Sequence, residues 1–517
     1  MRSVIVTGDA VTLEDLVAVA RGEARAELGP DVAARMEPSR RVVVDAVEQG
    51  TVMYGITTGF GALADTHVGR ADLERMQLAL IRSHSAGVGE PLEPAVVRLM
   101  LALKAASLAR GHSGVRPEVV EALLAVHNAG LVPYVPGQGS VGASGDLAPL
   151  AHMTLALLGE GEVWVDGQRK PSLGALRDAG IAPLRLAPKE GLALINGTQT
   201  STALALHAFF SFEPVLEAAL VIGAMTVDAA RGSDGPFDPR IHELRGQPGQ
   251  IDVARIYRAL LQGSPIRRSH LQGDDRVQDP YCLRCQPQVV GACLDSLRHA
   301  ARVLLTEANA VTDNPLVFAQ GDEGEGMLVS GGNFHAEPVA LAADACAVAI
   351  AEVGAIAERR VAMLIDGSVS RLLPFLAAQP GLNSGFMIAH VTAASLASEN
   401  KLLAHPASVD SLPTSANQED HVSMATFAAR RLQPMIHNTA HILGIELLAA
   451  AQGIDFLRPL SSSDSLEAAH AMLRRDCAAM MQDRYLAPDI ERATALVTDG
   501  TLAGVLKRLG VPPLWSS

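Results

Sequence analysis

The sequence predicts a mainly α-helical protein, in which a long central helix bundle accompanies a smaller mixed N-terminal domain. Hydrophobic residues make up 48% of the 517 residues but aromatic residues only 3%. The apolar mass is therefore Ala, Leu and Val, which suits close-packed helices better than a β-sandwich. Several apolar segments also run for more than 25 residues between polar joints rich in Gly and Pro. Both observations favour long helices.

Along the chain, the first hundred residues have mixed character and the remainder is dominated by helical signals. An apolar Val4-Ile5-Val6 followed by Thr12-Leu-Glu-Asp15, which is similar to a capping box, predicts a small strand and then a helix. We divide the chain into a mixed domain, 1–110, that carries the Tyr54 loop, and a helical body, 111–517. Helix starts at proline and stops at glycine lead us to expect helices over 93–110, 117–127, 198–231, 287–311, 338–365 and 420–451.

Bulk properties exclude several classes of partner. The net charge is −14 with a pI near 5.6, and no run of Lys or Arg forms a basic patch, so neither nucleic acid nor an anionic membrane is expected as a partner. The first residues lack a signal-peptide pattern, which favours the cytoplasm. The most lipid-like stretch carries Glu213, Glu217 and Asp228, so we predict no membrane span. Five scattered cysteines suggest reduced thiols.

The densest signal is the glycine-rich segment 137–152, which has more than one interpretation. Gly137-x-Gly139-x-x-Gly142, followed by the apolar 163–165 ending at Asp166, is similar to a dinucleotide-binding fingerprint. Prolines lie where the first strand of that fold should run, however, and the rest of the chain does not alternate strands with helices. A plain glycine-rich entry to a helix is a further alternative.

The chemical interpretation uses Ala143-Ser144-Gly145. Small neighbours let the Gly145 nitrogen reach the Ala143 carbonyl and close a five-membered ring, and loss of water that includes the Ser144 hydroxyl leaves an exposed methylidene. The product, 4-methylidene-imidazol-5-one (MIO), is an electrophile that no ordinary side chain supplies. Asp146 and a helix beginning near Leu147 are expected to cap the turn and direct positive potential toward the ring.

The segment GSVGASGDLAPLAH resembles the prosthetic-group segment of the histidine and aromatic amino acid ammonia-lyases. The resemblance implies a fumarase/aspartase-like helical architecture, a homotetramer whose sites combine loops of several subunits, and an MIO made from Ala143, Ser144 and Gly145 without an external cofactor. Further matches follow in the family's order over nearly the whole chain: MYGITTGFGAL (53–63), RSHSAGVG (82–89), LINGTQ (194–199), VQDPYCLRCQPQV (277–289), SGGNFHAEP (330–338) and SLPTSANQEDHVSM (411–424).

The resemblance also assigns roles that the elimination of ammonia requires. Tyr54 is implied as the base that takes the Cβ proton, and because an ordinary tyrosine ionises near pH 10, such a site must favour the phenolate. Arg284 is implied as the clamp on the substrate carboxylate, with a solvated surface arginine as the alternative. The remaining residues are implied to bond the ring and substrate or to line the pocket: Asn196, Tyr281, Gln278 and Phe334.

Substrate choice depends on Ser83-His84 and Glu419. Polar groups here match an imidazole better than a hydrocarbon ring, so the expected reaction is conversion of L-histidine to trans-urocanate and ammonia, the first step of histidine degradation. Thr57 and His390 depart from the pattern of the histidine enzymes. The alternatives are a phenylalanine or tyrosine lyase, an aminomutase on the same scaffold, and a catalytically silent helical structural or binding protein.

We predict no metal site from the sequence. Cys282-Leu-Arg-Cys285 has no second CxxC and lies inside a lyase-like segment. His335 and His421 have acidic neighbours in Glu337 and Glu419, but no HExxH or comparable ligand spacing occurs.

Overall fold

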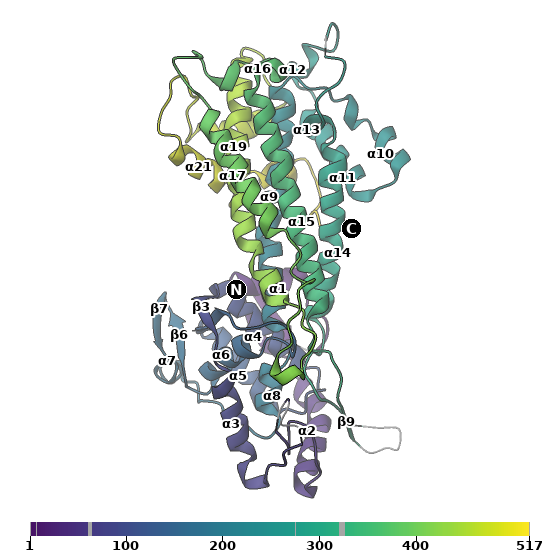
Figure 1. Ribbon diagram of the computed structural model, residues 1–517, viewed down its shortest axis with the longest axis vertical. Helices are drawn as coiled ribbons and strands as arrows, with labels where there is room; N and C mark the ends of the chain where they lie inside the picture. The colour runs from purple at the N-terminus through teal and green to yellow at the C-terminus, as the bar shows by residue number, and fades with distance from the viewer. Residues whose placement is uncertain are drawn as a thin grey trace. The chain divides into compact units, whose positions relative to one another are not determined.

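The computed structural model describes residues 2–6, 8–59, 61, 65–274, 276–319 and 326–515. It is mainly helical with a few short strands (Figure 1), as the composition predicts. The chain groups into two compact units that interleave in sequence. Unit 1 comprises Met1–His207, Arg302–Asp344 and Pro406–Arg430, and unit 2 comprises Ala208–Ala301, Ala345–His405 and Arg431–Ser517. The predicted domain boundary after residue 110 stays a prediction.

The N-terminus of unit 1 forms the predicted strand and helix. β1 (Arg2–Val6) pairs in parallel with β2 (Ala24–Leu28), and α1 (Leu13–Ala20) connects them. The Asp15 N–H donates to Thr12 Oγ1 at 3.2 Å, and the Thr12 N–H donates to Asp15 Oδ2 at 3.1 Å. This reciprocal capping box satisfies two N–H groups that the first helical turn leaves unpaired.

The rest of unit 1 combines helices with three small antiparallel sheets. The sheets pair β3 (Val88–Pro91) with β5 (Pro136–Gln138), β6 (Glu162–Val165) with both β4 (Val132–Pro133) and β7 (Gln168–Pro171), and β8 (Leu316–Phe318) with β9 (Met327–Val329). Because β6 lies between antiparallel neighbours, the apolar segment 163–165 is not a strand of a nucleotide-binding parallel sheet. The helices are α2 (Val32–Gln49), α3 (Leu73–His84), α4 (Pro94–Leu108), α5 (Pro117–Asn128), α6 (Leu147–Leu157), α7 (Ser172–Asp178), α8 (Glu190–Ile195) and α18 (Ala425–Arg430).

Unit 2 is built around long helices that run side by side (Figure 1). It contains α17 (Met387–Leu403) and α19 (Leu432–Phe456) together with large parts of α9 (Gln199–Ala229), α14 (Gln286–Ala308) and α15 (Glu337–Ile365). The shorter helices are α10 (Pro239–Arg245), α11 (Pro248–Leu261), α12 (Pro265–Arg268), α13 (Tyr281–Arg284), α16 (Gly367–Ser370), α20 (Asp464–Arg474), α21 (Ala487–Thr498) and α22 (Ala503–Arg508).

The interior of this bundle holds a buried ion pair. Arg360 Nε and Nη2 donate to Glu446 at 2.5 and 2.8 Å, and Thr226 Oγ1 donates to Glu446 at 2.6 Å. The arginine and the glutamate are 1% and 0% exposed. Removing one partner of such a pair leaves an uncompensated buried charge and costs about 3–5 kcal/mol. The pair therefore fixes how α9, α15 and α19 pack.

One predicted helix begins later than expected. Residues 420–424 are not helical, and α18 and α19 follow as separate helices. Met424 adopts a φ of +56°, and its N–H donates to the Val141 carbonyl at 2.9 Å. The prediction that the helix begins at residue 420 is wrong because these residues bond to the glycine-rich turn instead.

Two helices, α9 and α15, are long and apolar enough to cross a membrane by length and composition. In their most apolar windows 72% and 67% of the residues are buried inside the protein. Core helices of soluble proteins pass the same test, so length and composition are weak evidence for a span.

Candidate active site

Asp146 holds the glycine-rich turn in place. Its carboxylate is fully buried and accepts hydrogen bonds from Ser140 Oγ at 2.9 Å, Thr426 Oγ1 at 2.7 Å, and the N–H and Oγ of Ser201 at 2.7 and 2.9 Å. Asp146 occupies the N-cap position of α6, but its side chain makes no capping hydrogen bond there. Asp146 thus does not cap helix α6 with its side chain, but it bonds Ser140 within the turn and connects the turn to the segments that contain Ser201 and Thr426.

Two glycines are required by the shape of this turn. Gly142 and Gly145 have φ angles of +67° and +75°, which L side chains rarely adopt. A Cβ at Gly145 would overlap the backbone of Gly197, and one at Gly142 would overlap Ser423 Oγ. The Asp146 N–H donates to the Gly197 carbonyl at 2.8 Å. The backbone thus packs against its neighbours with no room for side chains.

The residues of the turn fit the cyclised form. In the described part of the chain, neither the Gly145 N–H nor the Ala143 carbonyl, the groups that cyclisation would join, makes a hydrogen bond. Asn196 Nδ2 donates to the Ser144 carbonyl at 2.7 Å, and that carbonyl would remain on the ring. Asn196 is 4% exposed, and its Oδ1 is buried without a partner. A polar group so placed suits a site that gains a further ligand.

Lys104 holds the backbone of Asn196 in place through hydrogen bonds. Its Nζ donates to the carbonyls of Asn196 at 2.7 Å and Ala193 at 3.1 Å, at the end of α8. The side chain is 1% exposed, and this burial lowers the pKa of Lys104 to about 7. Sequence reasoning missed Lys104, although a lysine inside the otherwise apolar 99–106 was a visible signal.

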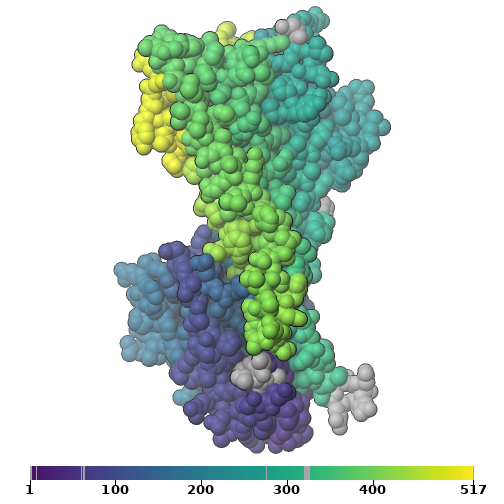
Figure 2. Space-filling model, viewed as in Figure 1, coloured from purple at the N-terminus to yellow at the C-terminus, as the bar shows by residue number. Residues whose placement is uncertain are grey.

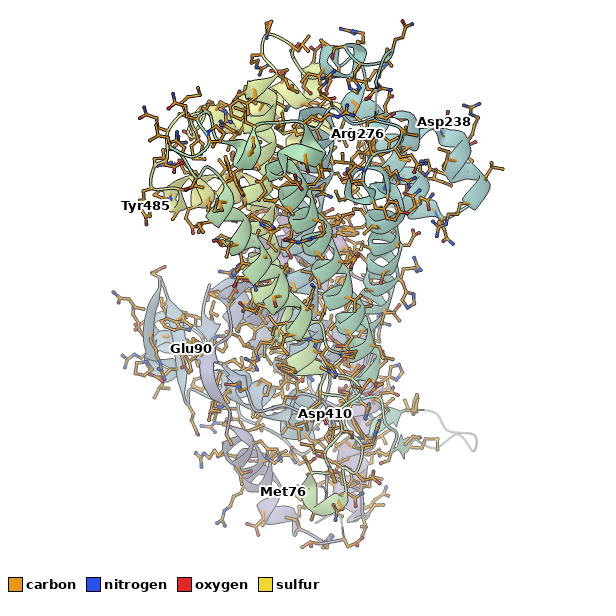
Figure 3. All side chains as sticks on the ribbon, turned by 45° about the horizontal axis from the view of Figure 1, so that its top comes forward. Met76, Glu90, Asp238, Arg276, Asp410 and Tyr485 are labelled. Carbon is orange, nitrogen blue, oxygen red and sulfur yellow. The ribbon has the colours of Figure 1, made fainter. Side chains whose placement is uncertain are left out.

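A pocket of about 1080 Å³ opens beside the turn within unit 1. Met76, labelled in Figure 3, contributes to its wall from α3. Seven of the predicted site residues also line it, which brings together sequence positions from 54 to 419: Tyr54, His84, Ala143, Ser144, Asn196, Phe334 and Glu419.

Tyr54 lies in a loop shaped by its own polar groups. Thr57 Oγ1 donates to the Thr51 carbonyl at 2.7 Å and accepts from the Met53 N–H at 2.8 Å. The Gly61 N–H donates to the Tyr54 hydroxyl oxygen at 3.1 Å. Thr57, a departure from the family pattern, therefore helps to set the position of Tyr54. Three residues of the predicted motif, at positions 60, 62 and 63, lie outside the described residues.

His84 and Glu419 give the pocket a polar end. His84 Nδ1 lies 2.9 Å from the Leu80 carbonyl, so Nδ1 carries the proton and Nε2 is left as an acceptor. Burial lowers the pKa of His84, while the Leu80 carbonyl and the Glu419 charge act in the opposite direction. Ser144 Oγ donates to Glu419 Oε1, and Thr414 Oγ1 donates to Oε2 at 2.7 Å.

Three predicted residues belong to unit 2 and do not line this pocket, namely Gln278, Tyr281 and Arg284. Tyr281 is 71% exposed. The Arg284 guanidinium lies 4.8 Å from the centre of the Tyr281 ring, and its Nε is buried without a partner. Within the described ranges, the pocket wall contains neither arginine nor lysine. A carboxylate anchor is therefore missing from the pocket as unit 1 builds it.

Comparison with known proteins identifies the class of enzyme to which this fold and pocket belong, a carbon–nitrogen lyase. The family model for aromatic amino acid lyases matches residues 11–475. The chain is 60% identical to a histidine ammonia-lyase of Aromatoleum aromaticum over 498 residues, or 96% of this chain and 93% of that protein. It is 59% identical to a histidine ammonia-lyase of Burkholderia cenocepacia over 495 residues, or 96% of this chain and 97% of that protein.

Solved structures extend the likeness to three dimensions. A histidine ammonia-lyase from Trypanosoma cruzi is 42% identical, with a TM-score of 0.90 over 98% of this chain and 96% of that chain. A tyrosine aminomutase from Streptomyces globisporus is 35% identical, with a TM-score of 0.92 over 98% of both chains. The chain belongs to the aromatic amino acid lyase family.

Proposed function

We propose that this enzyme converts L-histidine to trans-urocanate and ammonia. The observation that supports this most directly is the position of His84 and Glu419 in one pocket with Ser144. The names of relatives about 60% identical over nearly the whole chain point to the same reaction.

Selectivity follows from the chemistry of that polar end. An imidazole N–H donates to the Glu419 carboxylate or to His84 Nε2, both of which are acceptors. A phenyl ring has no donor and would leave these groups unpaired, which is how sites built for polar substrates reject apolar analogues. Elimination from phenylalanine is therefore disfavoured, and the names of the relatives about 60% identical favour histidine elimination over a tyrosine lyase or an aminomutase.

The prosthetic group in this proposal is MIO, made from Ala143, Ser144 and Gly145, and no external cofactor is needed. When formed, it supplies an electrophile that makes the substrate amino group a better leaving group. Gly142 and Gly145 allow the turn its shape, Asp146 anchors it, and Asn196 holds the carbonyl of Ser144.

The side chains carry out the remaining work. Tyr54 accepts the Cβ proton as the general base, the Cβ–H electrons form the new double bond, and the Cα–N bond breaks with its electrons leaving on the amine. The Asn196 amide donates to the Ser144 carbonyl oxygen and would stabilise negative charge on that oxygen once the ring has formed. His84 and Glu419 orient the substrate ring so that its Cβ faces Tyr54.

The carboxylate anchor in this proposal is Arg284 of a second subunit, with Tyr281 and Gln278 from the same segment. The unsatisfied Arg284 Nε and the lack of a cation on the described pocket wall support it. Arg284 also forms no ion pair with any described carboxylate, so its guanidinium group is available for two parallel hydrogen bonds to a substrate carboxylate.

Association into a homotetramer is the corresponding proposal for the assembly. Residues of α15 to α17, coloured green, form much of the face of unit 2 seen in Figure 2. Side chains on and near these helices are exposed although apolar, as expected for surfaces that a partner covers: Leu382 at 80%, Ile388 at 65%, Val391 at 55% and Leu402 at 77%. We place the assembly in the cytoplasm, free of nucleic acid and membrane.

Ultraviolet absorbance tests the reaction, because each candidate product is a conjugated acid with its own spectrum. We expect product from L-histidine and none from L-phenylalanine or L-tyrosine, and mostly aromatic product would overturn the interpretation of His84 and Glu419. A Ser144→Ala protein should lose turnover, and the wild-type peptide spanning 143–145 should be lighter than its sequence by two waters. An unmodified peptide together with silence towards all three amino acids would support a non-catalytic helical protein.

A further inference from the structure

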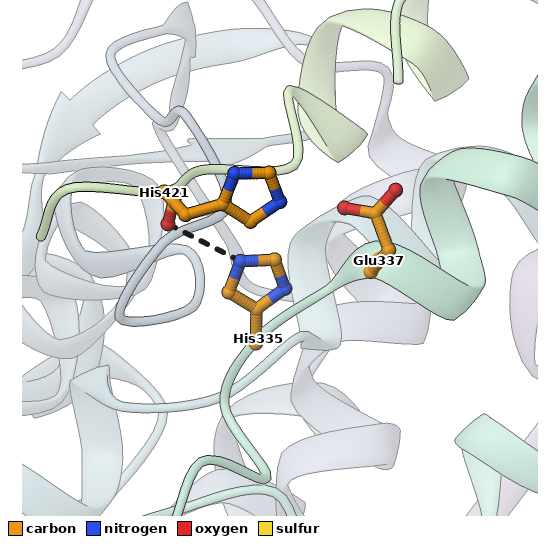
Figure 4. A group of neighbouring side chains, drawn as sticks. All are labelled: His335, Glu337 and His421. Carbon is orange, nitrogen blue, oxygen red and sulfur yellow. Dashed lines mark hydrogen bonds between the residues drawn. The ribbon is translucent and has the colours of Figure 1, made fainter. Parts of the chain in front are cut away.

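His335, Glu337 and His421 form a cluster beside the pocket, and the two histidines line its wall. Each offers one possible ligand atom, and these atoms lie within 4.8 Å of one another. Figure 4 shows the carboxylate of Glu337 facing both imidazole rings. The rings are nearly parallel, with an interplanar angle of 4° and centroids 5.6 Å apart. The two histidines are 86 residues apart in sequence, so ligand spacing along the chain gives no sign of this cluster.

Hydrogen bonds leave one nitrogen of each ring available. His335 Nε2 lies 3.3 Å from the His421 carbonyl, which only accepts, so Nε2 carries the proton and Nδ1 keeps its lone pair. His421 Nδ1 lies 3.3 Å from Ser411 Oγ, which also accepts from the Val422 N–H at 3.0 Å. Orientation of an imidazole by an oxygen behind it is the usual second interaction of a metal-binding histidine.

The carboxylate provides the third ligand. Glu337 Oε2 is buried without a hydrogen-bond partner, which is costly for a carboxylate unless another charge balances it. Glu337 forms no ion pair with either histidine within the described residues. The three groups thus face one another across a gap. Coordination at about 2.0–2.2 Å would close that gap through small side-chain rotations.

We propose that His335, Glu337 and His421 bind one divalent transition-metal ion of the zinc class. Two imidazoles and one carboxylate suit this class better than Mg²⁺ or Ca²⁺, which prefer oxygen ligands. Three protein ligands leave at least one coordination position open. Because His335 and His421 line the pocket, that position is accessible from the pocket that holds Ser144. All three ligands belong to unit 1, so the site requires no residue of unit 2.

The proposal goes beyond the elimination reaction and has a test that does not depend on activity. Full-length protein without a histidine tag would be stripped with a chelator and titrated with Zn²⁺ by calorimetry and with Co²⁺ by visible absorbance. We expect one ion per chain and a Co²⁺ spectrum without thiolate charge-transfer bands. His335→Ala, His421→Ala and Glu337→Gln should each weaken binding by about 10-fold or more, because each removes one ligand.

Matched controls separate this site from other zinc-binding groups. His299→Ala removes an exposed histidine and should bind Zn²⁺ like wild type. The double substitution Cys282→Ser and Cys285→Ser should also leave binding intact. Thermal unfolding in the absence of metal checks that each variant is folded, and Zn²⁺ should raise Tm for wild type but not for Glu337→Gln. The proposal is wrong if wild type binds no Zn²⁺, if the three ligand variants bind it unchanged, or if only the cysteine variant loses it.

Discussion

Replacing Asn196 by alanine tests the proposed electrostatic role of its amide. The change removes a donor 2.7 Å from the Ser144 carbonyl oxygen but retains the backbone carbonyl that accepts from Lys104. Loss of one preorganised donor to an oxygen that gains charge in the transition state lowers kcat by about 10²–10³, or about 2.7–4 kcal/mol. We expect an effect within this range because the amide is 4% exposed, so water does not readily replace it.

The assay follows formation of urocanate by absorbance, and peptide mass shows whether the prosthetic group has formed. A fall in kcat with KM changed less than about 3-fold is expected, because the interaction strengthens only in the transition state. Asn128→Ala is the control, since its side chain bonds the backbone of Ala26 at 2.9 and 2.7 Å and does not line the pocket. If Asn196→Ala formed the ring fully and kept kcat within about 3-fold of wild type, the proposed role would be refuted.

Three further predictions concern other parts of the machinery. Glu419→Gln should lower kcat/KM for L-histidine by about 10–150-fold, the value of one charge-assisted hydrogen bond, and an unchanged value measured by the same assay would exclude the contact. Arg284→Lys should raise KM by about 10-fold with a smaller change in kcat, because a lysine holds a carboxylate without the bidentate geometry; steady-state kinetics with KM unchanged would argue against the clamp. Burial lowers the pKa of Lys104 to about 7, whereas an unfolded lysine titrates near about 10.4. Between these pH values the unfolded state binds more protons than the folded state, so the free energy of unfolding of the wild type decreases as pH falls toward about 7. Below that pH both states bind the proton, and Lys104 causes no further loss of stability. Thermal unfolding of Lys104→Met should accordingly improve relative to wild type as pH falls from about 9.5 to about 7.5, and a constant difference in Tm would contradict the shift.

Helices with clear end signals were predictable from the sequence. Proline at the first turn and a positive-φ glycine beyond the end place α5 within a residue or two of its predicted bounds. α9 and α15 match equally well, and α14 ends three residues before its predicted end. α11 and α17 were not among the predicted helices. The exposed side chains of α17 give it little hydrophobic contrast between its faces, so its pattern lacks the periodicity that marks an amphipathic helix.

The site was predictable in its composition and only partly in its arrangement. Resemblance pointed to Tyr54, His84, Asn196 and Glu419, which the structure brings to one pocket. Lys104 was missed because it donates to backbone carbonyls. Every residue has a backbone carbonyl, so the residue types in the sequence do not indicate which one accepts. The actual role of Asp146 was hidden for a similar reason, since its partner Thr426 is 280 positions away.

That long-range connection determines when during synthesis the reactive turn is complete. The Asp146 carboxylate needs Ser201 and Thr426 as donors, and Gly142 needs the segment containing Ser423. A nascent chain lacks the turn's final contacts until residue 426 has left the ribosome. In the proposed enzyme, ring closure is consequently a late maturation event. Under the proposed function, the electrophile would form only once Glu419 and the rest of the pocket wall are present to shield it from cellular thiols and amines.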